Sequence, residues 1–158
     1  MMAAAAGIID ELRRRGLTVA TAESCTGGML AAALTDVPGA SDVFGWGLVT
    51  YSNEAKAQLL GVSRDTLDEY GAVSPQTAAE MAAGLLKLSG ADIALATTGV
   101  AGPGGGSAEK PVGLVYIACG NENDLQVKRC DFSGGRDAVR RQTVAEALSM
   151  LERFLEEK

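Results

Sequence analysis

The sequence predicts a three-layer α/β/α sandwich built on a mixed, mostly parallel sheet of about five strands. Helical and extended segments alternate through the first part of the chain, which is typical of α/β domains. Residues 92–97 are almost wholly apolar, as expected for a strand covered on both faces. With 158 residues and 47% hydrophobic content, the chain can bury a sizeable core. We therefore expect residues 1–158 to form a single domain.

In the first half of the chain, apolar periodicity and turn signals predict alternating helices and strands. Residues 3–15 carry apolar residues at helical spacing and end at Gly16, a common helix stop. The turn signal Val37-Pro38-Gly39 closes an alanine-rich helical run. The elements predicted here are helix 3–15, strand 17–22, helix 26–34, strand 44–51 and helix 53–60.

In the second half, caps and a hairpin turn bound the predicted elements. Ser74-Pro75 combines a favoured N-cap with proline at the first helical position, and Gly90 ends the helix that they begin. Residues 121–124 suit a hairpin turn between two strands. The elements predicted here are helix 75–88, strands 92–97, 112–118 and 125–132, and helix 136–155.

Charge and composition exclude several classes of function. The net charge is −6 and the pI is about 4.7, and no basic face is visible, so we expect no nucleic-acid partner. Three arginines of the last predicted helix, Arg136, Arg140 and Arg141, lie among acidic residues. Their simplest interpretation is a solvated helix face, and the sequence does not show whether they contact a ligand.

Cysteine usage and hydropathy indicate a soluble, cytoplasmic protein. Three cysteines cannot all pair within one chain, and none forms a C-x-x-C unit, which favours a reducing compartment. There is no histidine, so we expect no metal site. No apolar run approaches the roughly 18 residues of a membrane span. The N-terminus reaches Asp10 and Glu11 too soon for a signal peptide.

The stretch TAESCTGG, residues 21–28, places three potential nucleophiles side by side at a predicted strand-to-helix junction: Ser24, Cys25 and Thr26. Unpaired backbone N–H groups at a helix start favour a phosphate or a developing oxyanion. Gly27 and the glycine after it allow the backbone to approach a ligand closely. The alternative is an ordinary helix N-cap formed by Ser24 or Thr26.

In a chain without histidine, the stretch VTYSNEAK, residues 49–56, supplies a candidate base, Lys56. The pKa of a lysine is normally about 10.4, and a useful base needs roughly 7 to 8, a shift that costs about 3 to 5 kcal/mol. Burial or a neighbouring positive charge must provide this shift. Tyr51, at the end of a strand, is a candidate to relay the proton or to orient the lysine. The alternative is a surface lysine whose stem packs against the protein.

A glycine-rich loop follows Thr98 in the stretch ATTGVAGPGGGSAEKPVG, residues 96–113. It is not a dinucleotide fingerprint, because a strand rather than a helix follows, and it lacks the Gly-Lys-Ser/Thr of a P-loop. A loop of this length is usually functional, although a passive flexible loop is the alternative. The candidate donors for a phosphate are the backbone of Gly99, Gly102 and Gly105 and the side chains of Ser107 and Lys110.

All three stretches lie at or just after the carboxyl ends of predicted strands. Open α/β sheets form their ligand crevice at this end. We therefore expect Ser24, Tyr51, Lys56 and Thr98 to converge on one crevice.

These motifs, together with YGAVS at residues 70–74, closely resemble the CinA C-terminal domain family, also called the nicotinamide-nucleotide amidase (PncC) family. The resemblance runs from about residue 5 to 156, with four motifs in order and in register. It implies a three-layer α/β/α fold and a homo-oligomer. The molybdopterin-binding-like domain that precedes this domain in longer CinA proteins is not seen, which suggests the stand-alone form.

The resemblance implies hydrolysis of the carboxamide of nicotinamide mononucleotide to nicotinic acid mononucleotide and ammonia. It assigns Ser24 as nucleophile, Tyr51 and Lys56 as the family's tyrosine and catalytic lysine, and Thr98 as its active-site threonine. Neither a metal nor another cofactor is needed, and the expected partner is a small-molecule nucleotide.

From this resemblance we expect Ser24 to attack the amide while a neutral Lys56 accepts its proton, directly or through Tyr51. The N–H groups near Cys25 and Thr26 would hold the oxyanion, and the loop from Gly102 to Ser107 would hold the phosphate. Cys25 is a rival nucleophile, although cysteine hydrolases normally use a histidine partner. A different class of function is a non-catalytic nucleotide-binding or regulatory module, which would keep the loop and need neither Ser24 nor Lys56.

Overall fold

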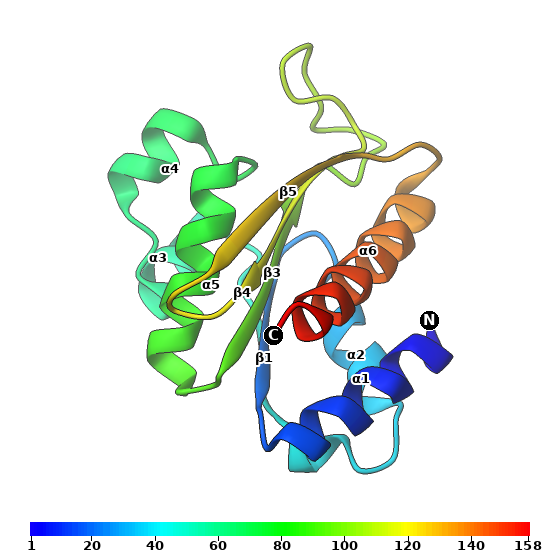
Figure 1. The fold of residues 1–158 in the computed structure, drawn as a ribbon. Helices are drawn as coiled ribbons and strands as arrows, with labels where there is room; N and C mark the ends of the chain where they lie inside the picture. The colour runs from blue at the N-terminus through cyan, green and yellow to red at the C-terminus, as the bar shows by residue number, and fades with distance from the viewer.

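A five-stranded mixed sheet in the order β2-β1-β3-β4-β5 forms the middle layer of the molecule (Figure 1). The structure is a computed structural model that describes all residues, Met1–Lys158. The strands are β1 (Val19–Glu23), β2 (Phe44–Val49), β3 (Ile93–Gly99), β4 (Leu114–Gly120) and β5 (Leu125–Asp131). β1 pairs in parallel with β2 and β3, and β4 pairs antiparallel with β3 and β5. Only β4 therefore runs against the other four strands.

Helices cover both faces of this sheet, which confirms the predicted three-layer α/β/α class (Figure 1). The helices are α1 (Met2–Arg15), α2 (Met29–Thr35), the 3-10 helix η1 (Ala40–Asp42), α3 (Asn53–Leu60), α4 (Arg64–Tyr70), α5 (Pro75–Ser89) and α6 (Arg136–Glu156). α1, α2 and α6 pack on one face, and α3, α4 and α5 pack on the other. None of these helices combines the length and the apolar character that a membrane crossing needs.

Alternate residues along the central strands supply the two cores. A cluster of 26 buried residues lies on the α1, α2 and α6 side and includes Ile93 and Leu95 of β3. A smaller cluster of 13 residues lies under α5 and includes Ala94 and Ala96 of the same strand. Successive side chains of a strand point to opposite faces, so one almost wholly apolar strand serves both layers.

Beyond shifts of up to two residues at strand ends, the structure differs from the predicted elements at three places, one of which is the short 3-10 helix η1, which was not predicted. α2 begins at Met29 rather than near residue 26, because Gly27 and Gly28 have φ angles of 55° and 102°, in the left-handed region that ends helical geometry. α4 was not predicted. Only Leu67 of its seven residues is buried, so the helix has almost no apolar periodicity in the sequence.

Two features bring the polar motifs to one end of the sheet. β1, β2 and β3 are parallel, so their carboxyl ends lie together, and each is followed or ended by one of the three stretches. Ser52 then caps α3 by accepting a hydrogen bond from the Ala55 amide at 3.0 Å, which fixes the start of the helix that carries Lys56.

We predict opposite effects for two glycine-to-alanine substitutions in helices. A Cβ at Gly84 of α5 would lie 1.7 Å from the carbonyl oxygen of Leu60, so Gly84→Ala should lower the free energy of unfolding by about 1–3 kcal/mol through overpacking. A Cβ at Gly7 of α1 would meet nothing within 4 Å, so Gly7→Ala should raise it by about 0.5–1 kcal/mol through the change in backbone entropy. Urea unfolding of both variants checks this. Equal effects of the two changes would contradict the close approach of α5 to the end of α3.

Candidate functional site

A cavity of about 290 Å³ opens at the carboxyl ends of the parallel strands. Its lining residues are Ser24, Cys25, Tyr51, Lys56, Ala72, Val73, Thr98, Gly99, Val100, Ala101, Gly102, Gly104, Gly105 and Arg136. This set contains two cationic side chains and no acidic one, in a chain whose net charge is −6. A larger hollow of about 440 Å³ lies at the opposite end of the sheet, but it brings no nucleophile and base together.

Lys56 lies directly against Ser24 inside this cavity. The Lys56 side chain is only 1% exposed, and its Nζ is 3.0 Å from Ser24 Oγ. The same nitrogen donates hydrogen bonds to the carbonyl oxygens of Thr50 at 2.8 Å and Tyr51 at 3.3 Å. A neutral amine has two hydrogens and one lone pair, so it can donate to both carbonyls and accept from the Ser24 hydroxyl. The geometry therefore accommodates lysine in its basic form.

Burial lowers the pKa of Lys56 from its ordinary value of 10.5 to about 8, and the nearby Cys25 thiol has a smaller opposite effect. The main cause is the loss of water around the ammonium, which disfavours the charged form. A fraction of this amine is therefore neutral near pH 7, as a general base requires.

The Cys25 thiol, next to Ser24 in sequence, is buried and has a raised pKa. The residue is 4% exposed, and burial raises the pKa of its thiol to about 11, with the Glu23 charge acting in the same direction. A thiol with this pKa holds almost no thiolate near pH 7, and thiolate is the reactive form. The structure thus favours Ser24 over Cys25 as nucleophile.

A buried carboxylate holds the start of α2, the helix that directly follows the turn at residues 24–28. Glu23, 0% exposed at the end of β1, accepts hydrogen bonds from the amides of Leu30 at 2.8 Å and Ala31 at 3.0 Å. These are first-turn amides of α2, so the start of this helix is already occupied by a protein anion. The prediction that a helix start faces the ligand is therefore wrong, and residues 25 and 26 belong to the preceding turn.

Arg140 of α6 holds the turn at residues 24–28 through two hydrogen bonds. Arg140 donates from Nε to the Cys25 carbonyl and from a terminal nitrogen to the Thr26 carbonyl, both at 3.0 Å. The Cys25 carbonyl and the Thr26 N–H belong to the same planar trans peptide, in which the two groups point in opposite directions. Because Arg140 binds the carbonyl, the Thr26 N–H points away from Arg140. The amides of Cys25 and Thr26 donate to no other residue. These two amides are therefore unpaired within the protein.

Hydrogen bonds to β3 also fix the position of the turn. The Ser24 amide donates to the Thr97 carbonyl at 3.0 Å, which ties the nucleophile candidate to β3. The hydroxyls of Thr26 and Thr97 are 2.8 Å apart in the interior, and Thr26 is fully buried. Neither Thr26 nor Gly27 is among the residues that line the cavity, although the sequence predicted both as ligand contacts, and the Thr26 side chain bonds to Thr97 in the interior instead. Gly27 lies beside Arg140, where a Cβ would come within 3.3 Å of the guanidinium.

Tyr51 contributes to the site in a different way from the one predicted. Its side chain is 59% exposed, and its hydroxyl accepts a hydrogen bond from Arg136 at 3.0 Å. The hydroxyl is thus engaged at the rim, while the backbone carbonyl orients Lys56. A proton relay through the Tyr51 hydroxyl is not supported, because Lys56 and Ser24 are already in direct contact.

Thr98 connects the site to the stretch YGAVS. Its hydroxyl donates to the Ala72 carbonyl at 2.7 Å, and the residue is 1% exposed. Ala72 and Val73 line the cavity beside it. The structure therefore places Thr98 in the site, where it positions one wall.

The glycine loop divides into a part that lines the cavity and a part that does not. Gly99, Gly102 and Gly105 line it, and the amides of Gly102, Gly104 and Gly105 have no acceptor within the protein. Arg136 donates to the Gly102 carbonyl at 2.8 Å, which fastens the loop to α6. Gly102 and Gly105 have φ angles of 83° and 81°, values that side-chain-bearing residues rarely adopt.

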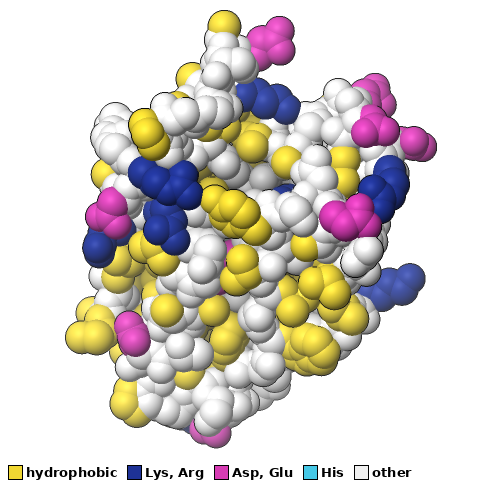
Figure 2. Space-filling view, turned by 180° about the vertical axis from the view of Figure 1, so that it is seen from behind, with side chains coloured by type: hydrophobic (Ala, Val, Ile, Leu, Met, Phe, Trp, Pro, Cys, Tyr) yellow, Lys and Arg dark blue, Asp and Glu magenta, His cyan; other side chains and the backbone are white.

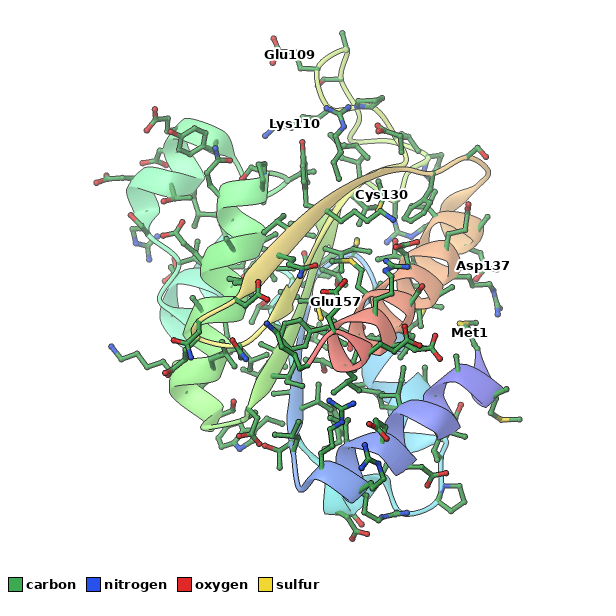
Figure 3. All side chains as sticks on the ribbon, in the orientation of Figure 1. Met1, Glu109, Lys110, Cys130, Asp137 and Glu157 are labelled. Carbon is green, nitrogen blue, oxygen red and sulfur yellow. The ribbon has the colours of Figure 1, made fainter.

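Ser107 and Lys110 lie outside the cavity, contrary to the prediction that their side chains face a phosphate. The Ser107 hydroxyl accepts a hydrogen bond from the Lys110 amide at 3.0 Å, and the Lys110 ammonium donates to the Tyr70 carbonyl. Figure 3 shows Glu109 and Lys110 on the part of the loop that projects beyond the sheet. These contacts close the loop and hold it to the end of α4.

Sequence reasoning missed the roles of Glu23 and Arg140 and left Arg136 open. The two arginines are four residues apart, a spacing that places them on one face of a helix, and this was the available signal. Nothing in the sequence indicated which face would meet the turn. No group of three or more His, Cys, Asp or Glu side chains is arranged to hold a metal ion.

Comparison with known proteins supports one family for the whole chain. The family model described as CinA C-terminal domain matches residues 2–155. A relative from Caldanaerobacter subterraneus is 55% identical over 149 residues, and a CinA-like protein from Desulfovibrio desulfuricans is 54% identical over 151. Each alignment covers 94% of this chain and 36% of the relative, so the chain spans about a third of the length of these curated relatives.

Solved structures agree with the fold. A competence/damage inducible protein from Agrobacterium tumefaciens has a TM-score of 0.95 at 49% identity, covering 97% of this chain and 94% of that one. A CinA superfamily protein from Klebsiella pneumoniae has a TM-score of 0.95 at 39% identity, covering 99% and 98%. The chain therefore belongs to the CinA C-terminal domain family.

Proposed function

We propose that this protein is a nicotinamide-nucleotide amidase that hydrolyses the carboxamide of nicotinamide mononucleotide to a carboxylate and ammonia. One observation carries the proposal. A lysine that is 1% exposed holds its Nζ 3.0 Å from a serine hydroxyl, at the wall of a cavity. A buried amine with a lowered pKa beside a hydroxyl is the arrangement that activates a serine in the absence of histidine. The substrate follows from the family resemblance and the cationic cavity.

The chemistry proceeds through an acyl-enzyme. Ser24 Oγ attacks the amide carbon while its proton passes to the neutral amine of Lys56. The amides of Cys25 and Thr26 stabilise the oxyanion of the tetrahedral intermediate. As this intermediate collapses, the Lys56 ammonium returns the proton to the leaving nitrogen, and ammonia departs. Lys56 then deprotonates a water that hydrolyses the ester, which releases the carboxylate and restores the Ser24 hydroxyl.

The other end of the cavity suits the phosphate of the nucleotide. Unpaired amides of Gly102, Gly104 and Gly105 and the Arg136 guanidinium lie along the rim. Backbone N–H groups and arginine are the usual donors to phosphate oxygens. Although the chain is acidic overall, no acidic side chain lines this cavity, so an anionic ligand would meet no like charge there.

Ser24→Ala should lower ammonia release from nicotinamide mononucleotide at least about 1,000-fold, because no other nucleophile in the cavity is activated. Cys25→Ala should retain most of the activity, since the buried thiol stays protonated. Ammonia release by the purified variants measures both. Saturable binding of the mononucleotide without ammonia release by the wild type would instead support a non-catalytic nucleotide-binding module. Inactivation by Cys25→Ala alone would make the thiol the nucleophile.

The kcat/KM should rise with pH and level off above about 8, since the active form carries a neutral Lys56. At pH 6, two units below the pKa of Lys56, kcat/KM should be roughly 100-fold below the plateau, because the neutral fraction of Lys56 falls about tenfold per pH unit. Lys56→Arg should be inactive across this range, because guanidinium stays protonated. Lys110→Arg, which changes a lysine outside the cavity, is the matched control. A near-normal rate in Lys56→Arg would exclude lysine as the base.

Arg140→Ala should lower kcat by about 10- to 100-fold with little change in KM, because it frees the turn that directs the Thr26 amide. Arg141→Ala removes a neighbouring arginine that pairs with Asp137 on the surface, and it should leave both constants unchanged. Arg140→Lys should be intermediate, since it restores one donor. The rate at which a phosphonate reagent labels Ser24, followed by mass spectrometry, gives a second readout. Equal labelling and kcat in Arg140→Ala and wild type would refute this role.

A further inference from the structure

Both halves of the proposed reaction depend on one position beside Lys56 Nζ. This nitrogen lies 2.8 Å from the Thr50 carbonyl and 3.3 Å from the Tyr51 carbonyl, which accept the two hydrogens of the neutral amine. Its single lone pair is left for Ser24 Oγ, at 3.0 Å, and Lys56 is the only hydrogen-bond partner of that hydroxyl. Every proton that enters or leaves the reacting centre therefore passes through the same point.

Burial restricts what can attack an acyl group carried by Ser24. Ser24 is 9% exposed and Lys56 is 1% exposed, and both are reached from the cavity that they line. Attack of an amine on the Ser24 ester is the reverse of the step that releases ammonia, so the amine enters at the position from which ammonia departs. This position, enclosed beside Lys56 Nζ, suits a nucleophile of the size of water or ammonia and excludes a bulky one.

The charges around the cavity favour a neutral nucleophile over a cationic one. Lys56 and Arg136 line the cavity and no acidic side chain does, while the nearby Glu23 carboxylate binds amides of α2. In the upper half of Figure 2, the end of the molecule that carries the glycine-rich loop, most acidic side chains lie toward the outline rather than the centre. An ammonium ion would therefore meet like charge without a counter-ion. A neutral amine avoids this repulsion and keeps the electron pair that attack on an ester requires.

We propose that this protein has a second activity, the transfer of the acyl group from Ser24 to small neutral amines in competition with water. The inference rests on the proposed amidase function, because it uses the acyl-enzyme of that reaction. It adds a class of acceptor, amines of about the size of ammonia that are uncharged near neutral pH, of which hydroxylamine is the simplest probe. It also adds a product, a substituted amide in place of the carboxylate.

The transfer step balances with the amine as its only added reactant. The amine nitrogen attacks the ester carbon and forms a C–N bond, while one of its protons passes to the neutral Lys56 amine. The C–O bond to Ser24 then breaks, and the Lys56 ammonium returns the proton to Ser24 Oγ. With hydroxylamine the products are a hydroxamate and the free enzyme. The tetrahedral oxyanion of this step meets the same backbone amides as in the proposed amidase reaction.

Hydroxylamine added to the assay with nicotinamide mononucleotide tests the inference, with both nucleotide products measured by mass spectrometry. A tenfold rise in hydroxylamine should raise the ratio of hydroxamate to carboxylate about tenfold, because both products come from one ester. The methyl ester of nicotinic acid mononucleotide should give the same ratio as the amide, since both substrates form the same acyl-enzyme. Ser24→Ala should form neither product faster than the uncatalysed reaction. Arg141→Ala, a change on the surface, is the matched control and should give the wild-type ratio.

A bulkier amine of the same kind tests where the acceptor enters. O-Benzylhydroxylamine is also uncharged near neutral pH, and it should be acylated roughly 10- to 100-fold less than hydroxylamine because its ring does not fit where ammonia departs. Equal transfer to both amines would overturn the inferred entry position. Ammonia release without hydroxamate, or different ratios from the amide and the ester, would overturn the transfer activity and leave the amidase proposal standing. A wild type that releases no ammonia and forms no hydroxamate would contradict both proposals.

Discussion

The burial of one amine against one hydroxyl governs the organisation of this protein. Lys56 Nζ lies between Ser24 Oγ and the carbonyls of Thr50 and Tyr51 and is almost completely shielded from water. Shielding lowers the pKa of Lys56 from 10.5 to about 8 in the folded state. Below pH 8 the buried ammonium lowers the free energy of unfolding by about 3 kcal/mol, because the same ammonium is fully solvated in the unfolded chain. This loss disappears as the pH rises from 8 to 10.5, where the amine becomes neutral in both states. The fold thus gives up stability near neutral pH to keep this amine buried, as its proposed role as a base requires.

Other residues of the site hold the segments around Ser24 and Lys56 in place. Arg140 binds two carbonyl groups of the turn at residues 24–28, and Glu23 binds two first-turn amides of α2, the helix that follows this turn. Arg136 reaches from one turn earlier on α6 to Tyr51 and to the glycine loop. α6 therefore connects three segments that are far apart in sequence. In the proposed reaction, rigid support of this kind would let the amides of the turn face a developing charge without reorganisation.

The electrostatic pattern explains how an acidic protein can suit an anionic ligand. The acidic residues lie outside the cavity, and the one buried carboxylate close to it, Glu23, is occupied by amides of α2. The cavity lining keeps Lys56, Arg136 and unpaired glycine amides.

The α/β/α class, most element positions, and the location of Ser24, Lys56, Thr98 and the glycine loop at one end of the sheet could be predicted from the amino-acid sequence. These follow from local signals, namely apolar periodicity, caps, turn residues and the rule that parallel strands gather their carboxyl ends. Other features became visible only in the folded molecule. Lys56 is buried and donates to the Tyr51 carbonyl, Ser107 and Lys110 lie outside the cavity, and Arg140 binds the turn at residues 24–28. These depend on contacts between residues up to 115 positions apart, such as Arg140 with Cys25. Local patterns contain no information about such distances, because packing of the helices on the sheet sets them.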